Sequence, residues 1–228
     1  MRVANIKKSI FLFLSVMVSL GTMAEDHDFT SNLEVGLSKK FFKRLELGLA
    51  EEVAFKNNSS DFDKFVTKTD LSFAVVRKVF KVGVNYYLIG KMHKDDYINL
   101  NHRFMGYTNL KFSAHRFTFA WRSRYQKTYS PEKKVHKQWK DYWRNKLSVS
   151  FKTPKIKLYP SVGAELFLRA NDYTEKPLYA SKLRYSAALK YEFNRSNSLK
   201  LEFQYDDRLD TKSAVNSVNI GLGYHYSF

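Results

Sequence analysis

The chain of 228 residues contains no cysteine, only four prolines and only nine glycines. Without cysteine it forms no disulfides, on which small exported domains often depend. Proline and glycine both weaken the interior of a strand, so their scarcity favours long, regular extended segments. No run of about 18 apolar residues occurs after residue 24, which excludes a membrane-spanning helix from that part of the chain.

Acidic residues are also scarce, with 22 Asp and Glu against 39 Lys and Arg, a formal net charge of +17. In a cytosolic protein this excess would point to nucleic acid. The N-terminus points to export instead, because Arg2, Lys7 and Lys8 precede the apolar run 10–20 and the small-residue ending 21–24. This pattern is typical of a cleavable signal peptide. We therefore predict a signal peptide over residues 1–24 and one mature domain over 25–228, with no nucleic-acid partner. A membrane anchor is the alternative, but the apolar run is short for one.

The residues that are abundant form strands, since aromatic residues make up 16% of the chain. From residue 28 onward, apolar and polar side chains alternate with a period of two, as in Leu45, Leu47 and Leu49 against Glu46 and Gly48. A helix would need apolar residues three and four positions apart. The alternation therefore predicts strands with one apolar face and one polar face.

Eleven such segments follow one another without a helical interval: 28–38, 44–56, 64–77, 79–91, 98–113, 116–128, 139–152, 156–170, 179–193, 198–209 and 215–228. Their connections alternate between short and longer ones, such as 113–115 against 57–63 and 127–138. The pattern predicts an all-β fold, an antiparallel up-and-down transmembrane β-barrel of about 10–12 strands, with the short turns facing the periplasm. Because bacterial single-chain barrels have even strand numbers, we expect 10 or 12 strands. Either a segment near the N-terminus is split or missed in this count, or segment 28–38 is not a full strand.

The apolar phase is nearly free of charge, apart from Glu51, Arg77 and Asp141. A charge at the bilayer midplane costs about 2–4 kcal/mol for Arg or Lys. Aromatic residues of this phase gather near both ends of the segments, as in the girdles of membrane barrels. We therefore expect this phase to face the lipid of the bacterial outer membrane. The alternative is a soluble periplasmic barrel with the apolar phase inside.

The polar phase then lines the lumen and is rich in cations. We expect nine of them to form a basic binding surface, mostly in the loop-side half of the barrel: Arg103, Arg122, Arg124, Arg144, Lys146, Arg169, Lys182, Arg184 and Arg208. Charged rings of this kind bias a pore, which predicts a small porin-like channel that favours small anions or acidic oligosaccharides. In the alternative, the carboxylates of Glu52, Glu165, Glu202 and Asp206 pair with these cations and plug a purely structural barrel.

An outer-membrane hydrolase with a site at the loop-side rim is a further alternative. Its candidate residues are His93 with Asp95 and Asp96, together with Asp206, Asp207 and Asp210. Such groups are more often a solvated loop, so we assign no catalytic residue. The sequence contains no His-x-His, Cys-x-x-Cys or acidic calcium loop, and we expect neither a metal nor a cofactor.

The last segment resembles the closing strand of outer-membrane barrels, which ends in an aromatic residue after alternating hydrophobic ones. The residues that carry this likeness are Val218, Ile220, Leu222, Tyr224, Tyr226 and Phe228. The resemblance implies that Tyr224, Tyr226 and Phe228 form the signal that the barrel-assembly machinery reads.

A second resemblance covers most of the mature chain. The stretches 143–147, 158–160, 165–167 and 183–185, together with 57–64 and 122–126, are similar to the family called domain of unknown function 2490. That family is regarded as small outer-membrane barrels without an established function. The resemblance therefore implies a fold and a location, and it implies no catalytic residues.

Overall fold

The computed structural model describes residues 28–93, 97–133, 138–170, 178–209 and 216–228. The predicted signal peptide, residues 1–24, lies outside this part of the chain. Eleven strands follow one another: β1 (Asp28–Phe41), β2 (Leu45–Lys56), β3 (Asp61–Val76), β4 (Phe80–Met92), β5 (Ile98–Ala114), β6 (Phe117–Tyr129), β7 (Trp139–Phe151), β8 (Leu158–Arg169), β9 (Tyr179–Glu192), β10 (Asn197–Arg208) and β11 (Ser217–Ser227). They match the eleven segments predicted from the alternation, and the described residues form no helix.

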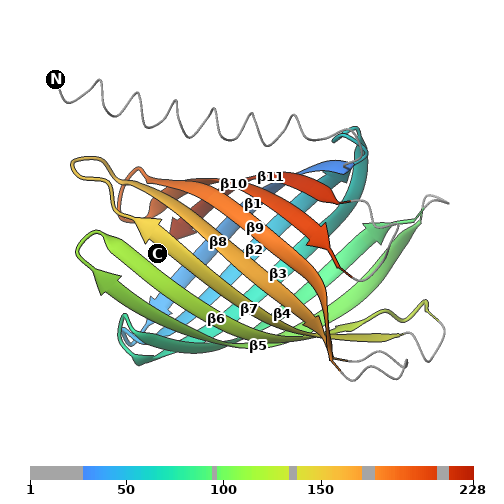
Figure 1. Cartoon of the computed structure of the whole chain (residues 1–228), viewed down its shortest axis with the longest axis horizontal. Helices are drawn as coiled ribbons and strands as arrows, with labels where there is room; N and C mark the ends of the chain where they lie inside the picture. The colour runs from blue at the N-terminus through green and yellow to red at the C-terminus, as the bar shows by residue number, and fades with distance from the viewer. Residues whose placement is uncertain (1–27, 94–96, 134–137, 171–177, 210–215) are drawn as a thin grey trace.

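The strands close into one barrel in which each strand pairs with the next in the chain (Figure 1). All of these neighbours are antiparallel, whereas β1 and β11 close the barrel as a parallel pair running from Asp28 opposite Ser217 to Ser38 opposite Ser227. The expected range of 10–12 strands is confirmed, but the preference for an even number is wrong. The first segment is a full strand, and a parallel ladder satisfies its backbone groups and leaves no open edge.

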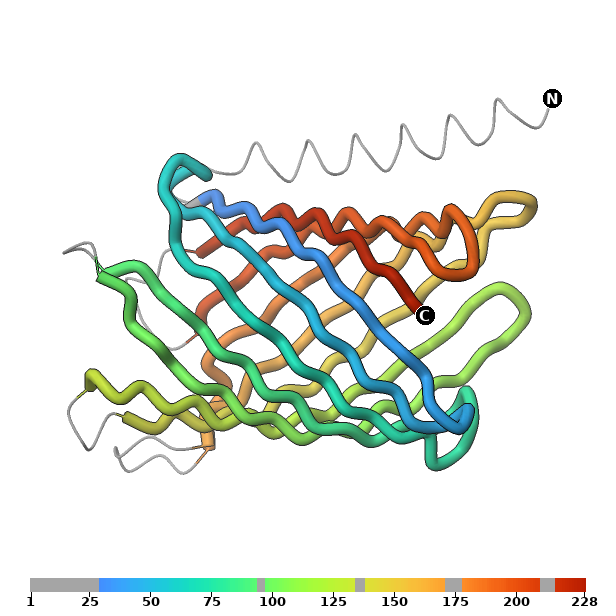
Figure 2. Tube along the Cα trace, turned by 180° about the vertical axis from the view of Figure 1, so that it is seen from behind, coloured from blue at the N-terminus to red at the C-terminus, as the bar shows by residue number. Residues whose placement is uncertain are grey.

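The two ends of the barrel differ in their connections. Short turns lie at one end, at 42–44, 77–79, 115–116, 152–157 and 193–196, and the C-terminus lies at this end as well (Figure 2). The connection after β2 is shorter than expected, because Asp61 to Asp63 belong to β3 and only 57–60 remain in the turn. Several turn residues have left-handed backbone conformations without being glycine, among them Lys78 with φ 66° and His115 with φ 53°.

The two faces of the strands are oriented as the alternation predicts for a membrane barrel. Apolar side chains of the outer face are exposed, for example Val35 (57%) and Leu147 (63%). Among the buried side chains are charged ones, for example Arg144 and Glu165. The soluble barrel with an apolar interior is therefore wrong for this chain. No helix within the described residues is long and apolar enough to cross a bilayer.

The two charged strand residues noted on the apolar phase have local partners. Glu51 accepts a hydrogen bond of 3.1 Å from the Thr67 hydroxyl on the neighbouring strand. Asp141 accepts one of 2.8 Å from the Tyr125 hydroxyl and lies 3.8 Å from the Lys127 ammonium group. These contacts lower the cost of holding a carboxylate on an outer face.

Candidate functional site in the barrel lumen

All nine predicted cations lie on the lumen phase of six consecutive strands, β5 to β10. Tertiary structure therefore gathers them on one wall of the barrel. Their surroundings differ, and the differences decide which charges are neutralised.

Arg144 and Glu165 form the most deeply buried ion pair of the lumen wall. The Arg144 Nε donates to Glu165 Oε1 at 3.1 Å, and its Nη2 donates to Oε2 at 3.0 Å. Arg122 shares the same carboxylate, with its Nη2 at 3.2 Å from Oε1. One carboxylate thus serves two guanidinium groups, and Glu165 itself is only 2% exposed.

A second cluster surrounds Phe167, a lumen residue that the sequence analysis did not single out. The Arg144 guanidinium lies 4.3 Å from the centre of its ring, and the Lys182 ammonium group lies 4.2 Å from it. Asp206 accepts hydrogen bonds from Lys182 at 2.8 Å and from Arg184 at 2.5 Å. Glu165 and Asp206 therefore pair with cations, as the plugged-barrel alternative expects.

Arg103 and Arg124 have no carboxylate partner among the described residues. The Arg103 Nε donates to the Thr128 hydroxyl at 3.2 Å. Arg124 has its Nη1 at 3.7 Å from the Met105 sulfur, and its Cζ lies 5.8 Å from the Tyr107 ring centre. The Arg124 Nε is buried without a hydrogen-bond partner. Neither guanidinium group forms an ion pair with a described carboxylate.

Like charges face one another directly across neighbouring strands. Four such pairs lie on this wall: Arg124 opposite Arg144, Arg122 opposite Lys146, Lys182 opposite Arg208, and Lys190 opposite Lys200. Like charges in directly opposed positions destabilise a sheet. The fold therefore retains an arrangement that costs stability.

The other wall of the lumen, from β1 to β4, carries further carboxylates, among them Glu34, Glu46 and Glu52. Glu34 and Glu52 both accept hydrogen bonds from Lys68, at 2.5 and 2.6 Å. Glu46 lies 3.2 Å from Lys81. The predicted pairing of Glu52 with one of the nine cations is therefore not what the contacts show, because Lys68 occupies this carboxylate. Glu202 likewise bonds Lys200, at 2.7 Å, which is not one of the nine.

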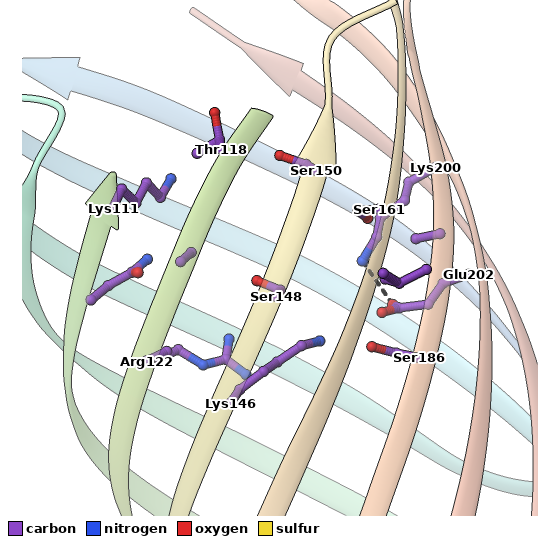
Figure 3. A pocket seen from close by; sticks show the side chains of 14 residues that line it. Lys111, Thr118, Arg122, Lys146, Ser148, Ser150, Ser161, Ser186, Lys200 and Glu202 are labelled. Atoms are coloured by element: carbon purple, nitrogen blue, oxygen red, sulfur yellow. Dashed lines mark hydrogen bonds and ion pairs between the residues drawn. The ribbon is translucent and has the colours of Figure 1, made fainter. Parts of the chain in front are cut away.

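Arg122 and Lys146 also line a recess of about 280 Å³ in the half of the barrel near the short turns (Figure 3). Arg122 lies near the middle of β6, and its guanidinium group bonds Glu165. Lys111 and Lys200, which line the same recess, were not among the predicted site residues. The sequence signal that could have indicated the recess is the run of small lumen residues Ser148, Ser150 and Ser161, because small side chains leave the lumen unfilled there.

The residues considered for a hydrolase do not assemble into a site within the described chain. His93 stacks on Tyr97, with ring centres 4.5 Å apart, and Asp206 is held by Arg184 and Lys182. Asp95, Asp96 and Asp210 lie outside the described residues. No cluster of His, Cys, Asp and Glu that fits a metal ion occurs in the described ranges.

The three residues of the predicted assembly signal lie at the short-turn end of β11. Tyr224 and Phe228 are exposed, Phe228 at 67%. The rings of Tyr226 and Phe228 meet edge to face, with centres 4.8 Å apart. The backbone N–H of Phe228 donates to the Ser38 carbonyl at 2.9 Å, which ties the C-terminus to β1.

Comparison with known families gives a match between residues 32–219 and the family described as protein of unknown function DUF2490. The chain belongs to this family. Comparison with curated proteins finds no match. Among solved structures, this DUF2490 member is similar to one described as the NanC porin in a rhombohedral crystal form. The TM-score is 0.54 at 14% identity, and the alignment covers 86% of this chain and 97% of that one. The likeness shows a shared porin-like barrel fold.

Proposed function

We propose that this DUF2490 protein is a channel of the bacterial outer membrane whose basic lumen favours anions. The observation that carries the proposal is the Arg124–Arg144 pair, two guanidinium groups directly opposed on neighbouring strands. Only Arg144 has a carboxylate partner among the described residues. Opposed arginines cost stability, and the channel explains why they are present: the charge of Arg124, which is in no ion pair, attracts an anionic solute.

The surroundings of Arg124 strengthen its effect on a passing ion. Arg122 and Arg144 both lie within electrostatic range of Arg124, where Glu165 is the opposing carboxylate, so cations outnumber acids around it. Charges held close together in a lumen with low-dielectric walls focus the field and raise the local concentration of anions. Small anions are therefore the expected cargo, and acidic oligosaccharides are the larger solutes of the same charge.

The remaining partners of the proposal are the outer-membrane lipid and the barrel-assembly machinery. The apolar outer face supports the first, since exposed side chains such as Leu33, Val84 and Val162 would contact acyl chains. The outward-facing aromatic residues of β11 support the second. The porin-like fold shared with the solved porin supports the channel itself.

Single-channel recording under a salt gradient tests the selectivity. We expect the wild-type barrel to give a reversal potential of the anion-selective sign. Arg124→Glu should shift that potential toward cations, because it reverses a charge that forms no ion pair with a described carboxylate. Lys43→Glu is the matched control, since it makes the same charge change in the turn between β1 and β2, and it should shift the potential far less.

A plugged structural barrel is the second candidate, and the buried ion pair of Arg144 and Glu165 favours it. An interior of about eight strands is just filled by side chains, and larger barrels begin to leave space. A correctly folded wild-type barrel that gives no openings would support this candidate and contradict the channel. An unchanged reversal potential in Arg124→Glu would contradict the proposed role of the arginines.

A further inference from the structure

The recess near the short turns is a separate feature of the lumen, and it is built by small side chains. Its walls come from β5 to β10 and include Ala120, Ser148, Ser150, Ser161 and Ala188. At these inward positions a longer side chain would fill the space that the recess keeps open. Its volume of about 280 Å³ is just below the range of about 300–1,000 Å³ typical of small-molecule pockets. The recess therefore suits a compact solute.

Four cations enter this recess: Lys111, Arg122, Lys146 and Lys200 (Figure 3). Two of them form ion pairs, because Lys200 bonds Glu202 at 2.7 Å and Arg122 bonds Glu165 at 3.2 Å. Lys111 and Lys146 form no ion pair with a described carboxylate, although Glu202 also lines the recess and lies within electrostatic range of Lys146. Lys146 also lies directly opposite Arg122, so repulsion adds to the cost of its position. With four cations and one lining carboxylate, the recess keeps an excess of positive charge, and two of its ammonium groups are outside any described ion pair.

Hydroxyl groups complete the lining and indicate the kind of solute. Ser148, Ser150 and Ser161 line the recess, and within the described residues their side-chain hydroxyls make no hydrogen bond to another group. None of the described lining residues is aromatic, so the recess has no flat apolar surface on which the face of a sugar ring would stack. Ammonium and hydroxyl donors without an aromatic platform match an oxyanion better than a neutral sugar.

We propose that this recess is a binding site for a compact oxyanion with two negative charges, such as inorganic phosphate. The ammonium groups of Lys111 and Lys146 supply the two compensating charges, and the serine hydroxyls donate to the remaining oxygens. The inference rests on the proposed function in one respect, because the solute reaches the recess through the anion channel. Binding itself requires no conduction.

Calorimetric titration of the folded, detergent-solubilised barrel with inorganic phosphate at pH 8 tests the site. We expect saturable binding of one phosphate per chain. Lys146→Gln and Lys111→Gln should each weaken it by about tenfold or more, as expected for the loss of one charge-assisted contact. Lys91→Gln removes the same charge at the loop end of β4 and should change the affinity by less than about twofold. Acetate, with one charge, should bind far more weakly than phosphate.

A second variant separates a built site from general attraction. Ser161→Val keeps every charge and removes a hydroxyl group, and we expect it to weaken phosphate binding without changing the reversal potential. Absence of saturable binding in a wild-type barrel that conducts anions would overturn the recess and leave the channel intact. Saturable, Lys146-dependent binding in a barrel that does not conduct would overturn the channel and leave the recess. Equal losses in Lys91→Gln and Lys146→Gln would also overturn the recess.

Discussion

Arg124 of β6 lies directly opposite Arg144 of β7, and the two guanidinium groups have very different partners. Arg144 holds a two-bond ion pair with Glu165, whereas Arg124 contacts the Met105 sulfur and the Tyr107 ring. One carboxylate on β8 therefore holds guanidinium groups from both β6 and β7. The charge that we expect a solute to meet comes from Arg124, which forms no ion pair with it.

Replacing Glu165 by Gln should destabilise the barrel strongly. The change leaves Arg122 and Arg144 without their carboxylate in a buried setting, and breaking a buried ion pair costs about 3–5 kcal/mol. Urea unfolding in detergent micelles measures the loss. Glu132→Gln is the matched control, since Glu132 is exposed in the connection after β6 and should change the free energy of unfolding by less than about 0.5 kcal/mol. Similar losses in both variants would contradict the shared ion pair.

Replacing Gly83 by Ala should loosen the packing of Tyr107. A Cβ at Gly83 would lie 2.5 Å from the Tyr107 Cζ, so the ring must move away from Asp70, to which its hydroxyl donates at 3.1 Å. We expect a loss of about 1–3 kcal/mol in the free energy of unfolding. Gly106→Ala is the control, because no atom lies within 4 Å of its added Cβ. The idea fails if both alanine variants unfold at the same urea concentration.

Replacing Phe228 by Ser should reduce assembly of the barrel in cells more than it reduces the stability of the barrel once folded. The proposed role of the C-terminal aromatic residues is recognition before folding. Phe112→Ser is the control, because Phe112 is exposed to the same degree, 69% against 67%, and lies at the same end of the barrel. The fraction of folded barrel in outer-membrane preparations should fall further for Phe228→Ser. The two variants should refold into vesicles to the same extent when no assembly machinery is present. Equal amounts of folded barrel for both variants in cells would contradict the assembly signal.

Replacing His115 by Asn should stabilise the turn between β5 and β6. His115 adopts φ 53°, a left-handed conformation that costs most residues about 1–2 kcal/mol and that Asn tolerates better. We expect a gain of about 0.5–1 kcal/mol in the free energy of unfolding, measured by urea titration. Arg116→Asn, at the neighbouring turn position without a positive φ, should give no gain. A destabilised His115→Asn barrel would show that the imidazole has a contact worth more than the strain.

The strands themselves could be predicted from the sequence because a strand exposes alternate side chains to opposite surroundings. Leu45, Leu47 and Leu49 against Glu46 and Gly48 already define the two faces of β2, and its observed bounds differ from the predicted ones by one residue. The even strand number was the wrong expectation. It came from a rule about barrels closed by antiparallel strands, and β1 and β11 close this barrel in parallel.

The sequence by itself determined the eleven strands, the outward-facing apolar phase and the lumen phase of the nine cations, because these follow from a local period of two. Only the tertiary structure decided which charges are cancelled. Glu52 and Lys68 are 16 residues apart, and Arg122 and Glu165 are 43 apart, so their pairing depends on strand register and barrel closure. The recess that Lys111 and Lys146 enter arises in the same way, from small side chains on strands that are brought together only in the folded barrel.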